Sequence, residues 1–333
     1  MSKIAILGGG GWGTGLAVVL AHSRRQHEIR MWVREPEIAR AVQEHRENPV
    51  YLPGVSLPEC VHATTEMREV LHEAQIVVGV VPSAFTREVF ARALPDIPVE
   101  AAIVSATKGL EPATRLRVSE VIEQVCSLRF VPQIAVLSGP SFAVEAARGG
   151  PTAVVVASKG TLATFIQEEF AGPSFRLYTN YDVIGVELAG AMKNVMAIAA
   201  GACQGLGLGA NALAALITRG LAEMTRLTVA LGGKPETLSG LAGLGDLVLT
   251  CNGQLSRNRH VGFELGRGRA LQEILGEMKS VAEGVGTTEA LVALARERGI
   301  ELPITEQVYS FLRLGNSPRD AIRAIMERPL RRE

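Results

Sequence analysis

The chain opens with a short apolar run and a glycine-dense turn, KIAILGGGGWGTGLA at positions 3–17. The spacing Gly8-x-Gly10-x-x-Gly13 within it is typical of a dinucleotide-binding loop between a strand and a helix. Glycines suit such a loop because they permit a tight turn, close approach of the backbone to a pyrophosphate, and packing of the helix on the strand. The helix N-terminus then attracts the anion through its amide groups and dipole.

The flanking sequence favours the nucleotide interpretation over a purely structural glycine turn. Residues 4–7 have the pattern of a buried strand, residues 16–20 that of an apolar helix face, and residues 28–33 that of a second strand. Together these three segments predict a βαβ unit that begins at the first residues of the chain.

The end of the second predicted strand bears on the choice of cofactor. A carboxylate there accepts hydrogen bonds from the ribose 2′-hydroxyl and repels a 2′-phosphate. This chain has Arg34 followed by Glu35. The Arg34 guanidinium favours NADP(H), because it can pair with a phosphate and stack on adenine, whereas Glu35 leaves NAD(H) open. A solvated charge at the strand end is the alternative for Arg34.

Strand-like and helical segments alternate to about residue 180, and helical patterns continue alone from there to about residue 327. The later strand-like runs are residues 75–81, 101–106, 133–137 and 152–157. This order predicts an α/β Rossmann-like domain over residues 1–180, with a doubly wound parallel sheet, and an all-α substrate-binding domain over residues 181–333. The proline-rich residues 48–58 predict an ordered loop outside regular structure, beside the cofactor.

Composition excludes several other classes of function. Basic and acidic residues number 34 each, so no global field favours nucleic acid or an anionic membrane surface. The four cysteines form no CxxC pair and the histidines no HExxH motif, which argues against disulfides and a metal site and fits the cytoplasm. Residues 194–218 carry no charge, but glycines and amides interrupt them, which favours two buried helices over a membrane span.

Lys193 and Asp246 are the strongest candidates for proton transfer. Lys193 lies in the apolar helical segment ELAGAMKNVMAIAAG, where desolvation should lower its pKa toward the value that suits a proton donor. A snorkelling lysine or a structural ion pair is the alternative. Asp246 follows two glycines in LAGLGDL, where it has a position to orient Lys193 or to serve as a turn or capping aspartate.

Phosphate-binding groups occur together at Ser256, Arg257 and Asn258, after a predicted loop at residues 250–254 and before a predicted helix. The alternative is an N-capping serine beside exposed arginines. Lys108 and the segment Gly139-Pro-Ser141 each follow a predicted strand of the sheet. They therefore belong to its carboxyl edge, where ligands bind in doubly wound folds.

With these motifs in place, the chain resembles bacterial NAD(P)-dependent glycerol-3-phosphate dehydrogenases over nearly its whole length. The matching blocks are GGGGWGTGLA, NPVYLPGVSLP, SATKGLE, LSGPSFAVE, ELAGAMKNV, GLAGLGDLVLTC, LSRNRHVG and AEGVGTTEA. The resemblance implies reversible reduction of dihydroxyacetone phosphate to sn-glycerol 3-phosphate, a phospholipid precursor, by NADPH or NADH. We also expect a cytoplasmic homodimer.

The resemblance also implies a set of site residues. Lys193 is the implied acid and base, Asp246 and Thr250 orient it, and Lys108 and Asn194 lie near the substrate oxygens. The implied substrate contacts are Lys108, Gly139, Ser141, Lys193, Asp246 and the phosphate-gripping Ser256, Arg257 and Asn258. With Gly8, Gly10 and Gly13, the implied cofactor contacts are Gly11, Trp12, Arg34, Tyr51, Lys108, Ala143, Arg257, Val281 and Glu283.

Three departures from the family pattern stand out. Gly11 replaces a common serine, Gly15 replaces a common alanine and should loosen the first helix slightly, and residues 251–253 differ from the common sequence. Two rival functions stay open at this point. One is a dehydrogenase of a β-hydroxy acid that also uses a lysine, and the other is a nucleotide-sensing module without catalysis.

Overall fold

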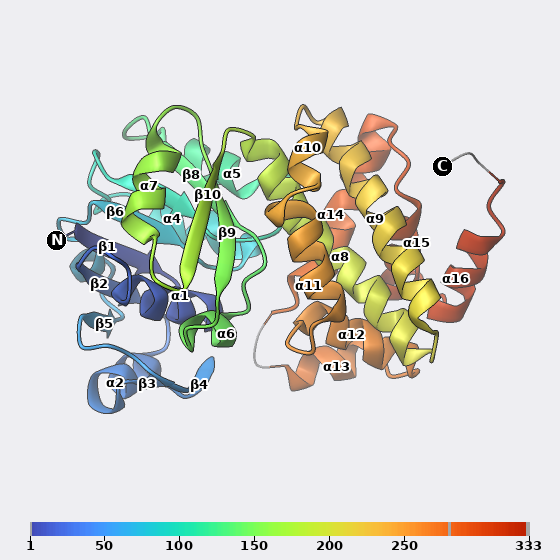
Figure 1. Ribbon diagram of the computed structural model, residues 1–333, viewed down its shortest axis with the longest axis horizontal. Helices are drawn as coiled ribbons and strands as arrows, with labels where there is room; N and C mark the ends of the chain where they lie inside the picture. The colour runs from blue at the N-terminus through green and yellow to red at the C-terminus, as the bar shows by residue number, and fades with distance from the viewer. Residues whose placement is uncertain (1, 279–280, 331–333) are drawn as a thin grey trace. The chain divides into compact units, whose positions relative to one another are not determined.

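The computed structural model of the chain describes residues 2–278 and 281–330. The chain forms two compact units (Figure 1). The first contains Met1–Glu111 and Leu116–Glu187, and the second contains Pro112–Arg115 and Leu188–Glu333. The chain therefore passes from the first unit to the second within one helix, α8 (Val183–Gly205), a few residues after position 180. The segment Pro112–Arg115 is a short excursion of the earlier chain into the second unit.

The first unit alternates strands with helices. Its strands are β1 (Ser2–Leu7), β2 (His27–Trp32), β3 (Glu47–Asn48), β4 (Leu52–Ser56), β5 (Val61–Thr64), β6 (Ile76–Gly79), β7 (Ala102–Ser105), β8 (Gln133–Ser138), β9 (Thr152–Ala157) and β10 (Phe175–Asn180). Its helices are α1 (Gly11–Ala21), α2 (Pro36–His45), α3 (Met67–Leu71), η1 (Ser83–Phe85), α4 (Thr86–Ala93), α5 (Val118–Cys126), α6 (Ala143–Ala147) and α7 (Leu162–Phe170). The six strands that the sequence predicts here all form, with ends within about two residues of those predicted.

Eight of these strands form one sheet in the order β10-β9-β8-β7-β6-β1-β2-β5. Six neighbouring strands in this order, β8, β7, β6, β1, β2 and β5, run parallel to one another. Strand β9 runs antiparallel to β8, and β10 runs parallel to β9. The prediction of a parallel sheet is therefore wrong for its last two strands. The reason lies in the connection between β8 and β9, whose only helix, α6, has five residues. A parallel crossover needs a longer return path, usually through a full helix.

Helices cover both faces of the sheet, as in a doubly wound fold. Ile4 and Ile6 point to the face packed by α1, α2, α6 and α7. Ala5 and Leu7 point to the other face, packed by α3, α4 and α5. Because successive side chains of a strand alternate between faces, a strand buried on both sides needs an uninterrupted apolar run. This is the pattern that the sequence shows at β1 and β6.

The segment at residues 48–58 is more regular than the sequence predicts. It contains β4, which pairs antiparallel with β3 in a separate two-stranded sheet. Pro53 and Gly54 lie within β4, and Gly54 adopts a positive φ of 72°. A strand that pairs along one edge alone can contain proline, because its other edge needs no amide donor.

The second unit is helical in all its described elements, as the sequence predicts. They are α8, α9 (Ala210–Ala230), α10 (Pro235–Leu238), a turn of π-helix η2 (Leu241–Gly245), α11 (Asp246–Asn252), α12 (Arg257–Gly266), α13 (Leu271–Glu277), α14 (Glu283–Arg298), α15 (Pro303–Arg313) and α16 (Pro318–Met326). Among the described residues, α8 alone is long and apolar enough to cross a membrane, but 89% of its most apolar window is buried in the fold. It is therefore a core helix.

The uncharged stretch at residues 194–218 does form two helices joined at a glycine-containing turn, α8 and the first half of α9. Only α8 is buried along its length. Residues 210–219 of α9 are half-buried or exposed, so the expectation of two buried helices is wrong for the second. Alanines such as Ala214 and Ala215 add little apolar area to the surface, so their exposure costs little free energy.

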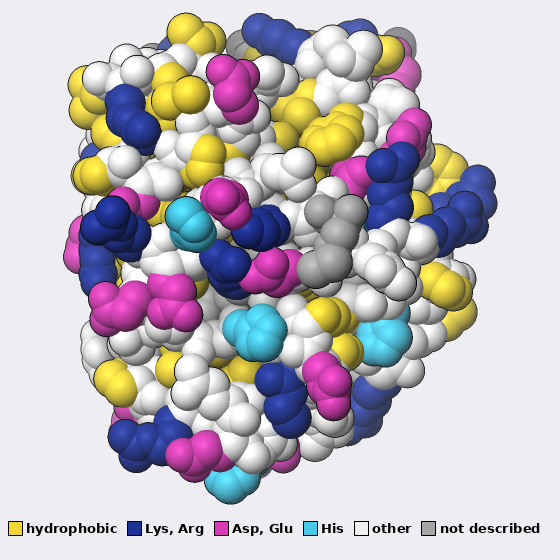
Figure 2. Space-filling view, turned by 90° about the vertical axis from the view of Figure 1, so that its left-hand side faces the viewer, with side chains coloured by type: hydrophobic (Ala, Val, Ile, Leu, Met, Phe, Trp, Pro, Cys, Tyr) yellow, Lys and Arg dark blue, Asp and Glu magenta, His cyan; other side chains and the backbone are white. Residues whose placement is uncertain are grey.

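Charged side chains of both signs are interspersed over the face shown in Figure 2. This distribution matches the equal numbers of basic and acidic residues in the sequence. Mixed charges of this kind give no single-signed field on that face.

Candidate functional site

The glycine-rich turn of the first unit has the geometry that a dinucleotide needs. Gly8 has a φ of 127°, and a Cβ there would lie 2.7 Å from the Val80 carbonyl oxygen. A Cβ on Gly13 would lie only 1.9 Å from the Gly8 carbonyl oxygen. At Gly10, the N-cap of α1, a Cβ would meet nothing within 4 Å. Gly8 and Gly13 are thus required by the turn itself, whereas Gly10 leaves open space beside a helix N-terminus, a cradle that fits a pyrophosphate.

A buried asparagine that the sequence did not single out holds this turn in place. The Asn48 Nδ2 donates to the Gly9 carbonyl oxygen at 2.9 Å and to the Thr14 hydroxyl at 2.8 Å. Its Oδ1 accepts the Tyr51 amide at 3.1 Å. The position of a Gly11 Cβ is 3.0 Å from the Tyr51 carbonyl oxygen. Asn48 therefore ties the turn to the segment at residues 48–51, which places Tyr51 beside the glycines.

Arg34 ends in a local network with Glu35. Its Nη2 and Nε donate to Glu35 Oε1 at 2.6 and 3.1 Å, and the Tyr51 hydroxyl donates to the same oxygen at 3.3 Å. The Glu35 carboxylate raises the pKa of Arg34, which keeps the guanidinium charged. Because the Arg34 side chain is 74% exposed, it remains accessible to a phosphate, although Glu35 competes for it.

The predicted substrate residues of the first unit meet at the carboxyl edge of the sheet. The Lys108 ammonium donates to the Gly139 carbonyl oxygen at 3.0 Å, and the Ser141 hydroxyl donates to the same oxygen at 3.0 Å. Gly139 has a φ of 137°, a conformation that favours glycine. Ala143 begins α6 just beyond, and a Cβ on Gly15 would lie 3.2 Å from the Ala143 Cβ. Gly15 therefore brings α1 close to α6, a packing benefit that opposes its low helix propensity.

In the second unit, Lys193 is buried in an ion pair. Its Nζ donates to Asp246 Oδ1 at 2.6 Å and to the Thr250 hydroxyl at 2.8 Å. The Thr250 hydroxyl in turn donates to the Asp246 carbonyl oxygen at 2.6 Å. Lys193 is 7% exposed and Asp246 is fully buried. The two acceptors stabilise the charged amine and fix its position, so the ammonium does not snorkel to the surface.

Helix geometry explains how the acceptors converge on Lys193. The sequence assigned Thr250 to a loop, but it lies in α11, four residues after Asp246. Residues four apart share one face of a helix, so both side chains reach the same amine on α8. The π-turn η2 leads directly into Asp246, and such turns occur frequently at functional sites. Burial raises the pKa of the neighbouring Cys251 thiol to about 12, so the thiol adds no charge here.

The three predicted phosphate-binding residues lie at the start of α12. The Ser256 hydroxyl accepts the Arg259 amide at 3.2 Å, which makes it the N-cap and confirms that structural role. Arg257 reaches solvent, yet the protein atoms crowded around its guanidinium lower its pKa, and the Glu283 carboxylate opposes that shift. Asn258 is buried, and its Oδ1 accepts the Gly284 amide at 2.9 Å.

The other predicted residues take varied positions. Asn194 is buried next to Lys193 on α8, Trp12 packs partly buried against the core, and Val281 is 49% exposed before α14. The structure therefore brings Lys193 together with its two partners in the second unit, and a second set of predicted residues around Gly139 in the first. Their contacts with substrate and cofactor remain predictions.

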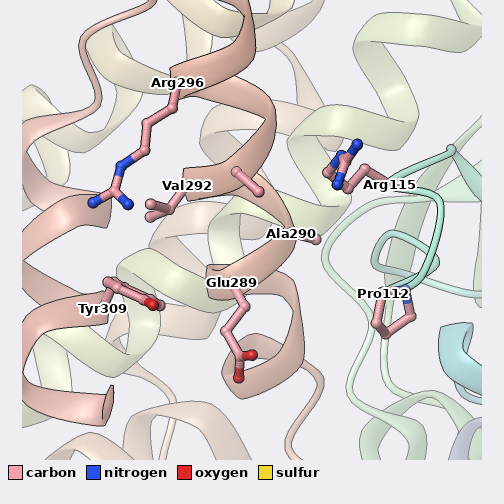
Figure 3. A pocket seen from close by; sticks show the side chains of 8 residues that line it. Pro112, Arg115, Glu289, Ala290, Val292, Arg296 and Tyr309 are labelled. Carbon is pink, nitrogen blue, oxygen red and sulfur yellow. The ribbon is translucent and has the colours of Figure 1, made fainter. Parts of the chain in front are cut away.

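Two hollows lie away from these residues. One, of about 290 Å³, lies against α14, α15 and the segment Pro112–Arg115 (Figure 3). The Arg296 guanidinium there stacks on Tyr309 at 5.7 Å, and Glu289 is paired with Arg313. Another, of about 460 Å³, lies at the amino ends of β6, β7 and β8, the edge opposite to that used by ligands in doubly wound folds. Neither contains a predicted site residue.

Known proteins resemble this chain along its whole length. The family models described as NAD-dependent glycerol-3-phosphate dehydrogenase N-terminus and C-terminus match residues 3–163 and 182–323. A glycerol-3-phosphate dehydrogenase [NAD(P)+] of Koribacter versatilis is 53% identical, over 99% of this chain and 98% of its own. One of Myxococcus xanthus is 49% identical, over 97% and 96%. The crystal structure of glycerol-3-phosphate dehydrogenase from Coxiella burnetii is 42% identical, with a TM-score of 0.93 and coverage of 98% and 99%.

Proposed function

Because the chain belongs to the family of NAD-dependent glycerol-3-phosphate dehydrogenases, we propose that it reduces dihydroxyacetone phosphate reversibly to sn-glycerol 3-phosphate. The observation that carries the proposal is the buried amine of Lys193, held by Asp246 and Thr250. It is a fixed proton donor of the kind that reduction of a ketone requires.

The first unit is the cofactor domain of this proposal. Gly8, Gly10 and Gly13 form the cradle for the pyrophosphate, and the N-terminus of α1 stabilises its charge. Bound there, a reduced nicotinamide supplies a hydride to the carbonyl carbon of the substrate. The remaining proposed cofactor contacts are Gly11, Trp12, Arg34, Tyr51, Lys108 and Ala143 of this unit and Arg257, Val281 and Glu283 of the second. The exposed Arg34 guanidinium supports a preference for NADPH over NADH.

The second unit supplies the proton and the phosphate contacts. Lys193 Nζ gives a proton to the carbonyl oxygen as negative charge develops on it, and takes the proton back in the reverse direction. Asp246 and Thr250 fix the donor by accepting two of its hydrogen bonds. Ser256, Arg257 and Asn258 bind the substrate phosphate at the start of α12, where amide groups and helix dipole favour an anion.

Lys108, Asn194, Gly139 and Ser141 complete the proposed substrate site. The Lys108 ammonium and the Ser141 hydroxyl already share the Gly139 carbonyl oxygen, so both are held at the carboxyl edge of the sheet. A cation at that edge is suited to the oxygen atoms of a polar substrate.

Three wider features belong to the same proposal. The product supplies glycerophospholipid synthesis, the protein works in the cytoplasm, and it forms a homodimer. The four cysteines, all free, support a reducing compartment.

The test is an assay of reduced-nicotinamide absorbance with dihydroxyacetone phosphate and each of NADPH and NADH. Oxidation of either cofactor is expected. A β-hydroxy-acid dehydrogenase would instead reduce its cofactor with such an acid, and a nucleotide sensor would bind NADPH without oxidising it. The variant Arg257→Gln separates the first rival further. It should raise KM for dihydroxyacetone phosphate by about 10- to 100-fold, the value of a charge-assisted hydrogen bond, and leave turnover of an unphosphorylated acid unchanged.

A further inference from the structure

The first turn of α14 meets the helices that carry the proposed proton donor and phosphate grip. Gly284 is the second residue of α14, and its amide donates to Asn258 Oδ1 of α12 at 2.9 Å. The Gly284 carbonyl oxygen accepts a hydrogen bond from the Thr288 hydroxyl, one turn further along α14, at 2.6 Å. Both backbone polar groups of Gly284 are therefore held by side chains. Gly284 and Asn258 are both buried, the latter 8% exposed.

Gly284 also lies in a space too small for a residue with a Cβ. A Cβ there would lie 2.8 Å from the Asn194 carbonyl oxygen, 2.9 Å from Asn258 Oδ1 and 2.9 Å from Ile198 Cδ1. The first two neighbours are a backbone atom and a buried amide that already holds a hydrogen bond, so neither can move cheaply. Gly284 is therefore a point where α8, next to Lys193, and α12, next to Arg257, both contact α14.

The contact with Gly284 decides which edge of the Asn258 amide is presented elsewhere. A backbone N–H requires an acceptor, so Oδ1 must face Gly284 and the NH₂ group must point away from it. Of the described residues, none accepts a hydrogen bond from Asn258 Nδ2. The phosphate oxygens accept hydrogen bonds from an amide. The NH₂ edge of Asn258 therefore binds a phosphate, and its oxygen edge repels one.

We propose that Gly284 is a positioning residue for substrate specificity: its amide and its missing side chain orient Asn258 so that Nδ2 donates to the phosphate of the substrate. The inference rests on the proposed function. The alternative is a purely structural contact, in which Asn258 only satisfies an amide of the first turn of α14. The two roles differ in what happens to a substrate without phosphate.

The test compares kcat/KM for dihydroxyacetone phosphate with kcat/KM for dihydroxyacetone. Gly284→Ala should lower the ratio of the two by at least about tenfold, because it displaces one charge-assisted hydrogen bond to the phosphate. Gly286→Ala is the matched control, since a Cβ at Gly286 meets nothing within 4 Å on the same helix. It should leave the ratio unchanged. A structural defect would lower both kcat/KM values alike and leave the ratio as it was, which would overturn the proposal.

Two further variants protect the test against misfolding of Gly284→Ala. Asn258→Asp keeps an acceptor for the Gly284 amide but replaces Nδ2 by oxygen, so the ratio should fall at least as far at a temperature where circular dichroism shows the variant folded. In an Asn258→Ala background, Gly284→Ala should change the ratio no further. An unchanged ratio in Asn258→Asp, or an additional loss in the double variant, would refute the role.

Calorimetric titration with inorganic phosphate gives a readout without turnover. The wild type and Gly286→Ala should bind phosphate alike, and Gly284→Ala should bind it more weakly. If the wild type binds phosphate in this pattern but fails to oxidise NADPH with dihydroxyacetone phosphate, the proposed function fails and the role of Gly284 stands. If turnover is normal and the variants bind phosphate equally, the proposed function stands and the role of Gly284 fails.

Discussion

Separating the buried pair of Lys193 and Asp246 should destabilise the protein more than removing both charges. Nζ and Oδ1 are 2.6 Å apart, and the two residues are 7% and 0% exposed, so neither charge has much access to water. Asp246→Asn or Lys193→Met leaves one buried charge without its partner, which typically costs about 3–5 kcal/mol. The double variant leaves no charge and should cost less than the sum of the two.

Calorimetric melting of the four proteins measures this cycle. For a unit of about 150 residues each kcal/mol shifts the melting temperature by about 2–4 °C, so each single variant should melt roughly 6–20 °C lower. Both tryptophans, Trp12 and Trp32, lie in the first unit, so their fluorescence follows that unit separately. Single variants that each cost under about 1 kcal/mol and add in the double variant would refute the reasoning, because that is how a solvated pair behaves.

Four other substitutions test separate parts of the structure. Gly13→Ala should lower the melting temperature, because its Cβ would lie 1.9 Å from the Gly8 carbonyl oxygen. Gly10→Ala should leave the melting temperature unchanged, yet it should weaken NADPH binding in a fluorescence titration by at least about tenfold. Arg34→Gln should lower the kcat/KM preference for NADPH over NADH by about 10- to 100-fold, and an unchanged preference would assign the 2′-phosphate to another group. Burial raises the pKa of Glu223, so its contribution to stability is full below the unfolded value of about 4.3 and is lost as the pH rises through the folded value. The unfolding free energy of wild type minus Glu223→Gln, from denaturant titrations, should therefore fall with rising pH, and a rise would contradict the burial.

Features set by local pattern could be predicted from the sequence. The apolar runs of β1 and β6 required burial on both faces of a sheet, and the spacing of Gly8, Gly10 and Gly13 required the turn that follows β1. The reversal of β9 could not be read in the same way, because strand pattern carries no direction. Its signal was the short connection at residues 139–151, which holds too little helix for a parallel return.

Contacts between distant residues were harder to predict. Asn48 lies in a proline-rich segment, where nothing in the local pattern shows that its amide will bond to Gly9. The sequence pattern predicts a loop at Thr250, whereas the residue lies one helical turn after Asp246 in α11, and the four-residue spacing between them is the signal that indicates this. The role inferred for Gly284 depends on three helices at once and leaves no mark in the sequence beyond a glycine in a first turn.

Turnover by Lys193→Ala tests the central claim most directly. With dihydroxyacetone phosphate and NADPH saturating, and at a temperature where circular dichroism shows the variant folded, kcat should fall at least about 100-fold because the proton donor is gone. NADPH affinity, measured by titration, should stay within about twofold, because the cradle for the pyrophosphate lies in the first unit. Turnover at the wild-type rate would show that the amine held by Asp246 and Thr250 does not transfer the proton.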